Sequence, residues 1–189
     1  MDVYWDFVEL PSQILENWCY EEDTLKLFAT HYETGEVIPM DLIEKIKASA
    51  TFHEGMQTLR QLSFGLLDMA WHAVDPSEIK NVKAYETEAF KDTQFYPEVP
   101  ENCMSTAFAH IFQGGYSSGY YSYKWAEVLD ADAFDYFKQE GIFNKTVANK
   151  FKTYILSQGG TENPMTLYKK FRGQEPKPEA LLKRAGLLK

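Results

Sequence analysis

The densest group of side chains that could do chemistry lies between His110 and Tyr123, in the run HIFQGGYSSGYYSY. Tyr120 and Tyr123 are three residues apart and would share one face of a helix, and Tyr116 could join them from a flexible turn earlier. Phenol hydroxyls donate a hydrogen bond without carrying charge, which suits the stabilisation of an oxyanion. A tyrosine-rich helix that packs its rings would show the same spacing, so the residue types alone leave both interpretations open. The turn contains three glycines, which widen the choice of backbone conformation: Gly114, Gly115 and Gly119.

Metal-ligand spacing is a second possible source of chemistry, and the histidines do not supply it. The four histidines are His31, His53, His72 and His110, and no two of them are four residues apart. In the run HEGMQ, Gln57 stands where a zinc-peptidase helix needs its second histidine. We therefore interpret His53-Glu54 as a solvated pair and disfavour a histidine-only metal site.

Asp6 and Glu9 are a third pair of interest, in the run DFVELPSQ. By spacing alone they resemble a helix capping box, in which Asp6 accepts from helix amides and Glu9 reaches back. A single glutamate beside aromatic residues is weak evidence for a metal ligand, so spacing alone favours the cap.

Apolar residues recur at helical spacing along almost the whole chain, so we expect helices to position these side chains. Pro11 should kink or restart the first helix, and Gly35 should end the second. The run from Phe95 to Asn102 should be an extended loop because it holds two prolines. An apolar stripe on the fourth helix suggests burial and consists of Met56, Leu59, Leu62, Leu66 and Met69. The helices expected are about 4–18, 23–35, one from Asp41, 52–71, 105–112, 120–140 and two or three shorter ones after Gly141.

Composition bounds the class of protein. The chain has 189 residues, of which 44% are apolar and 15% aromatic, so we expect one helical domain over residues 1–189. The net charge of −9 and the absence of a dense basic run disfavour a nucleic-acid partner. No apolar stretch is long enough to span a membrane, and the first residues do not resemble a signal peptide. With only Cys19 and Cys103 present, we expect a reducing, cytoplasmic location.

Two of these segments together resemble a known family. The run YWDFVELPSQILENW at residues 4–18 resembles the block that follows the H-E-x-x-H helix in zinc peptidases of the thimet oligopeptidase, oligopeptidase A and peptidyl-dipeptidase family. The run from His110 to Trp125 resembles that family's glycine- and tyrosine-rich substrate loop and the helix after it. The similarity covers essentially the whole chain, to the ending FRGQEP near residues 171–176.

The resemblance assigns roles that spacing could not. It implies that Glu9 is the third protein ligand of a catalytic zinc, and Asp6 is a plausible partner for a ligand imidazole. It makes Tyr116 and Tyr123 the phenols that bind substrate and stabilise the tetrahedral intermediate. The supporting contacts in the same cleft, including the glycines of a loop that closes over the peptide, would be His110, Tyr120, Gly114, Gly115 and Gly119.

The sequence also departs from the family pattern, because no H-E-x-x-H run occurs in it. The resemblance implies the helical C-terminal part of a two-lobed, channel-containing peptidase of short peptides. We expect zinc in the full-length parent, none held by these residues alone, and no activity without the rest of the parent chain. The alternative is a non-catalytic helical fragment or interaction module. Whether the parent acts as a peptidyl-dipeptidase or as an endo-acting oligopeptidase stays open.

Overall fold

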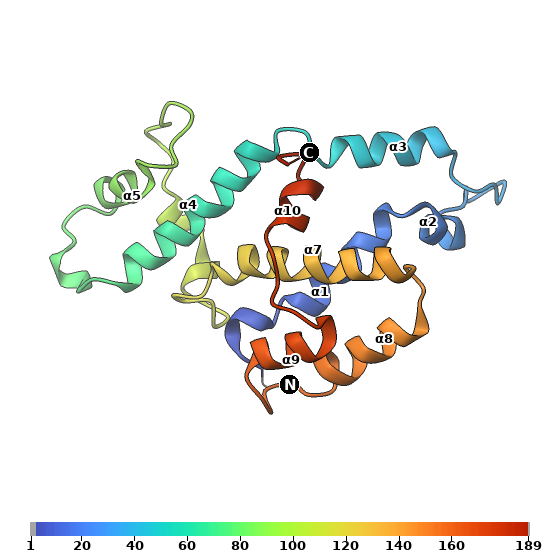
Figure 1. Cartoon of the computed structure of the whole chain (residues 1–189). Coiled ribbons are helices and arrows are strands. Elements are labelled where there is room, and N and C mark those ends of the chain that lie inside the picture. The colour runs from blue at the N-terminus through green and yellow to red at the C-terminus, as the bar shows by residue number, and fades with distance from the viewer. Residues whose placement is uncertain (1–2, 189) are drawn as a thin grey trace. The chain divides into compact units, whose positions relative to one another are not determined.

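The computed structural model describes residues 3–188, and within them the chain is helical (Figure 1). The one pairing of extended backbone among these residues is an isolated antiparallel bridge between Thr30 and Val37. The all-α class is therefore confirmed. The α-helices are α1 (Leu10–Glu16), α2 (Glu22–Phe28), α3 (Met40–Ser49), α4 (Glu54–His72), α5 (Val82–Phe90), α6 (Met104–Ala107), α7 (Ser122–Glu140), α8 (Lys145–Phe151), α9 (Pro164–Arg172) and α10 (Glu179–Arg184). Short 3₁₀ helices occur at Trp5–Phe7, Asn17–Tyr20, Pro76–Glu78 and Ala109–Ile111, and a π-helix at Lys152–Leu156.

The chain divides into two compact units. Unit 1 combines residues 1–54 with residues 125–189, and unit 2 is residues 55–124. That the whole chain forms one domain stays a prediction.

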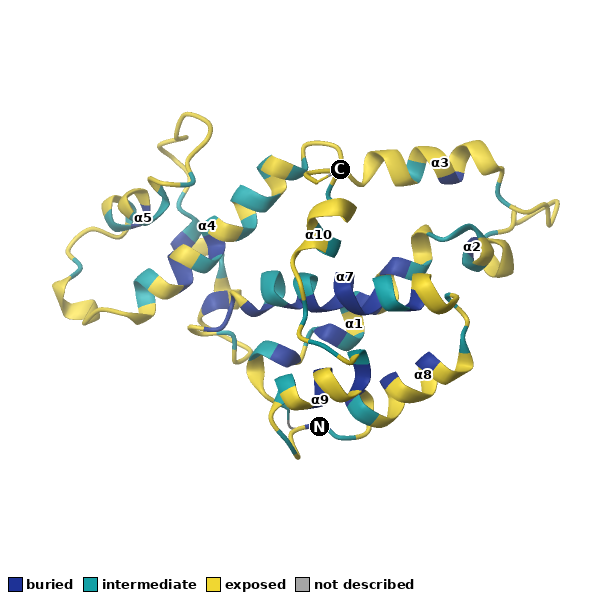
Figure 2. Cartoon of the chain, viewed as in Figure 1, coloured by how far each residue is buried: buried dark blue, intermediate teal, exposed yellow. Residues whose placement is uncertain are grey.

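Helix α7 supplies the centre of the core of unit 1. Its apolar and aromatic residues recur at helical spacing, which is typical of a buried helix. In Figure 2 the buried residues of this unit gather along α7. Ala133, Phe134 and Phe137 face a cluster to which α1, α8 and α9 contribute. Trp18 closes one end, with its ring centroid 4.7 Å from that of Phe134 and its indole N–H donating to the carbonyl of Ile142. The contributing residues outside α7 include Leu10, Ile14, Val147, Phe151, Tyr168 and Phe171.

The first segment bends where its proline predicts. Trp5–Phe7 forms a 3₁₀ turn, and α1 begins anew at Leu10 with Pro11 in its first turn, where a missing N–H costs nothing. Leu10 and Ile14 are fully buried on one side of α1. The proline thus sets where the chain turns before the helix that carries this core face.

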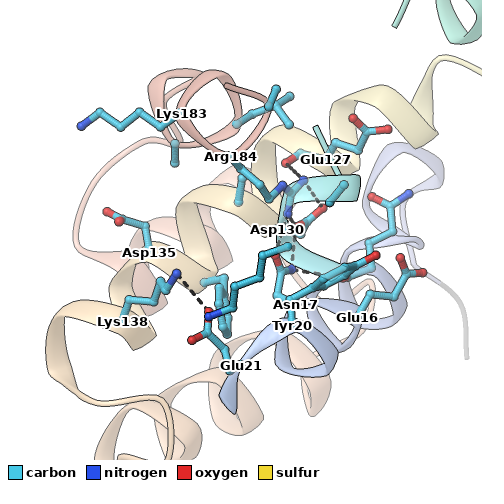
Figure 3. Close-up of a pocket in the computed structure, with 18 of the residues that line it drawn as sticks. Glu16, Asn17, Tyr20, Glu21, Glu127, Asp130, Asp135, Lys138, Lys183 and Arg184 are labelled. Atoms are coloured by element: carbon cyan, nitrogen blue, oxygen red, sulfur yellow. Dashed lines mark hydrogen bonds and ion pairs between the residues drawn. The ribbon is translucent and has the colours of Figure 1, made fainter. Parts of the chain in front are cut away.

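Within unit 1, a charged group joins the C-terminal helix α10 to α7 (Figure 3). Arg184 forms an ion pair with Asp130 of α7 and donates to the side-chain oxygen of Asn17 at 2.7 Å. Asn17 in turn donates to Asp130 at 2.9 Å. Asp130 is 1% exposed, so its charge depends on these two partners.

Unit 2 is organised by α4, but on a different face from the one predicted. Phe64, Leu67 and Asp68 are its buried residues, and they pack toward Ile111 and Tyr120. In the predicted stripe, Met56 and Leu59 are partly buried, whereas Leu62, Leu66 and Met69 are each 45–47% exposed. The suggested burial of this stripe is wrong for three of its five residues, because α4 is apolar on two faces and within this unit the aromatic partners cover the other one.

The second predicted helix was too long. It ends at Phe28, and Gly35 lies instead in the turn between Thr30 and Val37, with φ +72°. Glycine tolerates this left-handed conformation, so it marks a turn here rather than a helix stop. The extended run from Phe95 to Asn102 is confirmed as non-helical. No helix within residues 3–188 is both long and apolar enough to cross a membrane.

Candidate functional site

The structure brings the histidine and three of the four tyrosines of the glycine-rich segment together within unit 2. The Nε2 atom of His110 lies 2.8 Å from the hydroxyl oxygen of Tyr123, a hydrogen-bond distance. The ring of Tyr116 stacks on that of Tyr123 with centroids 5.2 Å apart and lies 4.4 Å from that of His110. Tyr120 completes the group, with its ring centroid 5.1 Å from that of Tyr123. We call these four residues the phenol cluster.

One short element and the turn after it position the cluster. His110 lies in the 3₁₀ turn Ala109–Ile111, whose Ile111 is fully buried and fixes the turn to α4. Gly114 and Gly115 follow with φ +70° and +83°, a region that other residues adopt at a cost. This reversal returns the chain so that Tyr116 meets His110. The glycines are thus needed for the backbone shape, as their number suggested.

Exposure differs within the cluster in a way that matters for chemistry. Tyr120 is 9% exposed, whereas His110 is exposed and Tyr116 and Tyr123 are partly buried. Burial raises the pKa of Tyr120 above its usual value, and the neighbouring Tyr123 adds to that rise while Arg60 opposes it. Tyr120 therefore stays a neutral hydrogen-bond donor, and Tyr116 and Tyr123 present the reachable phenols.

Asp6 and Glu9 lie in unit 1, and their geometry is not that of a capping box. Asp6 is inside the 3₁₀ turn, and Glu9 is the residue before α1, where its side chain makes no capping hydrogen bond. Both are partly buried and flank the buried Phe7. The hydroxyl of Ser12 donates to Glu9 Oε2 at 3.2 Å and to the Glu9 carbonyl at 3.0 Å. The carboxylate of Glu9 is thereby oriented by the first turn of α1.

The other metal candidates give no site of their own. His53 is exposed, has φ +55° and places its ring 4.0 Å from that of Phe52. Among residues 3–188 no group of three or more His, Cys, Asp or Glu side chains could hold a metal ion. Within residues 3–188, Glu9 is therefore not part of a complete metal-binding group.

Sequence reasoning missed Asp68, the buried carboxylate at the foot of the phenol cluster. Asp68 is fully buried on α4 and accepts the backbone N–H groups of Ser118 and Tyr120, each at 2.9 Å. A signal was present, because Phe64, Leu67, Asp68 and Trp71 follow helical spacing and one of them is acidic. An acid on an apolar helical face must find partners.

Comparison with known proteins identifies the family of this all-helical chain. The sequence profile of Peptidase family M3 matches residues 1–187. The chain belongs to this peptidase family. It is 46% identical to Oligopeptidase A of Escherichia coli strain K12, over 98% of the chain and 27% of the relative.

Further relatives show the range within the family. The chain is 44% identical to Probable cytosolic oligopeptidase A of Arabidopsis thaliana, over 99% of the chain and 27% of that protein. It is 36% identical to Dipeptidyl carboxypeptidase of Escherichia coli strain K12, over 96% of the chain and 27% of that protein. The chain thus spans about a quarter of the length of these curated relatives.

Proposed function

We propose that this chain is the part of a zinc peptidase that holds the carbonyl group of a short peptide during hydrolysis. The observation that supports this most is the contact between His110 and the hydroxyl of Tyr123, 2.8 Å apart, with Tyr116 stacked beside it. Membership of Peptidase family M3 and the names of the relatives supply the reaction class. The substrate class is short peptides.

The phenols act by donating hydrogen bonds to a developing oxyanion. When water adds to a peptide carbonyl, the oxygen gains negative charge, and a neutral donor already aimed at it stabilises the transition state more than the substrate. Tyr123 is the stronger candidate because its hydroxyl is held by His110 and its ring lies against two other phenols. Tyr116 follows two left-handed glycines and can reach the peptide from the turn.

Glu9 is proposed as a zinc ligand, with Asp6 as a partner for another ligand's imidazole. Bound zinc would supply a Lewis acid and an activated water. One carboxylate does not fit a zinc site by itself, and residues 3–188 form no group of three or more ligating side chains, so the proposal takes the remaining ligands from the rest of the parent chain. Within the chain, Ser12 orients the Glu9 carboxylate, and the buried Phe7 and Leu10 fix the backbone on either side of it.

The partner implied is the remainder of the parent peptidase chain. Leu62, Leu66 and Met69 follow helical spacing on α4 and are each 45–47% exposed, which forms an apolar stripe. Large exposed apolar areas mark interaction surfaces. The share of the relatives that this chain does not cover is long enough to supply the covering surface.

The second candidate is a non-catalytic helical module that binds another chain through the same stripe. It rests on the exposure of Leu62, Leu66 and Met69, which marks an interaction surface. A cytoplasmic location is proposed for either candidate, since both cysteines are free thiols and one relative is named cytosolic.

One experiment separates the two candidates. The parent protein that contains this chain should cleave a short internally quenched peptide, and removal of metal by a chelator should abolish cleavage. The 189-residue chain alone should be inactive on the same peptide. A parent that binds zinc but cleaves no short peptide, whatever its sequence, would favour the non-catalytic module.

A further inference from the structure

The buried carboxylate of Asp68 accepts hydrogen bonds from the backbone at the end of the glycine- and tyrosine-rich turn. Its Oδ1 accepts the backbone N–H of Ser118 and its Oδ2 that of Tyr120, both at 2.9 Å. The carboxylate is 0% exposed and lies near the C-terminal end of α4, four residues before His72. It therefore contacts the backbone from inside the unit and is closed to solvent.

The backbone held by Asp68 is in a conformation that needs support. Ser118 has φ +57°, in the left-handed region that non-glycine residues rarely adopt. Such a conformation persists only where surrounding contacts impose it. The N–H groups on either side of Gly119 each donate to the carboxylate of Asp68, and hydrogen bonds to a carboxylate are stronger than those between neutral groups. These two bonds hold Ser118 in its left-handed conformation.

His72 is the ionisable group that faces Asp68 from the same helix. Its Nδ1 lies 2.9 Å from Asp68 Oδ1 and 2.7 Å from the Asp68 carbonyl oxygen. The imidazole ring is itself placed against Phe112, with centroids 5.7 Å apart. The carboxylate thus has one oxygen shared between His72 and Ser118 and the other directed to Tyr120.

The backbone of Ser118 and Tyr120, which Asp68 holds by hydrogen bonds, determines where the phenol rings lie. Tyr120 is itself held at its N–H, and Tyr123 follows within the first turn of α7, with its N–H directed to the Tyr120 carbonyl. Tyr116 lies two residues before Ser118, and its carbonyl accepts the Gly119 N–H at 2.9 Å. A shift of this backbone would move Tyr116 and Tyr123 relative to His110.

We propose that Asp68 is a positioning residue for the phenol cluster: it fixes the backbone at Ser118 and Tyr120 and thereby aligns Tyr116 and Tyr123. Its consequence for peptide hydrolysis rests on the proposed function. Because Asp68 is fully buried, it acts through the backbone and not by touching substrate.

Glu86 offers a matched control in the same unit. It is 3% exposed and also accepts two backbone N–H groups, those of Met104 at 3.0 Å and Ser105 at 2.5 Å. It fixes the start of α6 rather than the turn between Gly114 and Gly119. A merely structural role for Asp68 would make Asp68→Asn and Glu86→Gln behave alike.

Amide hydrogen exchange in the 189-residue chain tests these hydrogen bonds of Asp68 and needs no enzymatic activity. In the wild-type chain, the amides of Ser118 and Tyr120 should exchange at least about tenfold more slowly than those of Gly115 and Ser117. Equal rates would overturn the proposal, and this comparison needs no variant to fold. Asp68→Asn should speed exchange at Ser118 and Tyr120 and shift the ring nitrogen resonances of His110, which report its contact with Tyr123. Glu86→Gln should change neither.

Kinetics of the parent enzyme test the consequence for catalysis. Asp68→Asn should lower kcat about tenfold or more with little change in KM, because the phenols are misaligned in the transition state. Glu86→Gln should leave kcat near the wild-type value. Equal losses in the two variants, or a change in KM alone, would overturn the positioning role. If the wild-type parent cleaves no peptide, the proposed function falls, and the amide and His110 measurements still decide the proposal.

Discussion

At the scale of single residues, chemistry in this chain depends on a few polar groups placed at the edge of aromatic packing. The hydroxyl of Tyr123 has an imidazole partner at 2.8 Å, while Tyr121, two positions earlier, is 48% exposed. Tyr121 lies in the turn just before α7 and does not pack into the core. The two tyrosines therefore make a matched pair for a test.

Tyr123→Phe in the parent should lower kcat by about 10²-fold or more, as loss of one oxyanion donor does. The ring and its stacking on Tyr116 are kept, so the change removes the hydroxyl alone. Tyr116→Phe should also lower kcat and can change KM, since its turn must meet the substrate first. Steady-state kinetics on a quenched peptide give both values. Tyr121→Phe is the control, and equal behaviour of Tyr121→Phe and Tyr123→Phe would remove the oxyanion role.

Glu86 should give the chain a measurable acid sensitivity. Burial acts to raise the pKa of Glu86, but hydrogen bonds from the backbone of Ser105 and Met104 and the nearby Lys83 outweigh it, so that the pKa is lowered. The unfolded chain then binds a proton at higher pH than the folded chain does. The stabilising contribution is present above the unfolded pKa and is lost as the pH falls through the folded one.

We therefore expect Glu86→Gln to flatten the pH dependence of stability below about pH 5. Chemical denaturation of the chain and the variant at a series of acidic pH values measures the free energy of unfolding. A wild-type curve and a variant curve of the same slope in this range would show that the lowered pKa of Glu86 contributes nothing.

At the scale of elements, helices are joined to their neighbours by buried charges as well as by apolar faces. Asp68 joins α4 to the turn before α7, Glu86 joins α5 to α6, and Asp130 joins α7 to α10. Each carboxylate is at most 3% exposed and accepts hydrogen bonds from partners remote in sequence. Short elements such as α6 and α10 have little apolar area of their own, so these contacts set where they lie.

Arg184→Met should release α10 and destabilise unit 1. Asp130 would stay buried with Asn17 as its remaining partner in the Arg184 network (Figure 3). Because the side chain of Arg184 is 38% exposed, solvent screens the pair, and we expect a cost of about 2 kcal/mol. Thermal or urea unfolding measures it. Lys183→Met, on the adjacent exposed position, is the control and should change stability by less than about 0.5 kcal/mol.

At the scale of the whole molecule, the chain spans about a quarter of the length of its relatives, and we propose that it supplies part of a larger peptidase. Its proposed contribution is divided between the two units, with Glu9 in unit 1 and the phenol cluster in unit 2.

The 189-residue chain should hold well under one zinc per molecule after exhaustive dialysis. A single carboxylate ligand is too few for tight binding, and zinc sites in proteins use three or four ligands. Elemental analysis gives the ratio. The parent should retain zinc, and Glu9→Gln in the parent should lower its zinc content, whereas Glu16→Gln on the same segment should not. Zinc held tightly by the isolated chain through Glu9 would contradict the proposed ligand set.

The whole chain should unfold in one cooperative transition, as the expected single domain requires. A single transition is favoured because one continuous helix, α7, begins at Ser122 among the residues of unit 2 and ends at Glu140 among those of unit 1. Calorimetry and far-ultraviolet circular dichroism should give the same midpoint. Two resolved transitions would show instead that units 1 and 2 are separate domains.

The sequence by itself determined the helical class, the break at Pro11, the family, and the membership of the phenol cluster. The helical class and the break at Pro11 follow from local rules, since apolar spacing sets helices and proline removes an amide donor. The family, and with it the grouping of His110 with the tyrosines, came from the resemblance of whole segments, and the glycines permit the left-handed turn that returns Tyr116 to His110. The roles of Glu9 and Asp6 came from the family resemblance, and they stay proposals.

Only the tertiary structure decided which face of α4 is buried and what Asp68 does. Both faces of α4 carry apolar residues, so periodicity could not choose between Leu62 with Leu66 and Phe64 with Leu67. The choice is made by partners about 50 residues away in sequence, the ring of Tyr120 and the amides of Ser118 and Tyr120. Such long-range pairing is invisible to local spacing, because a buried charge is explained by the groups that satisfy it and not by its neighbours along the chain.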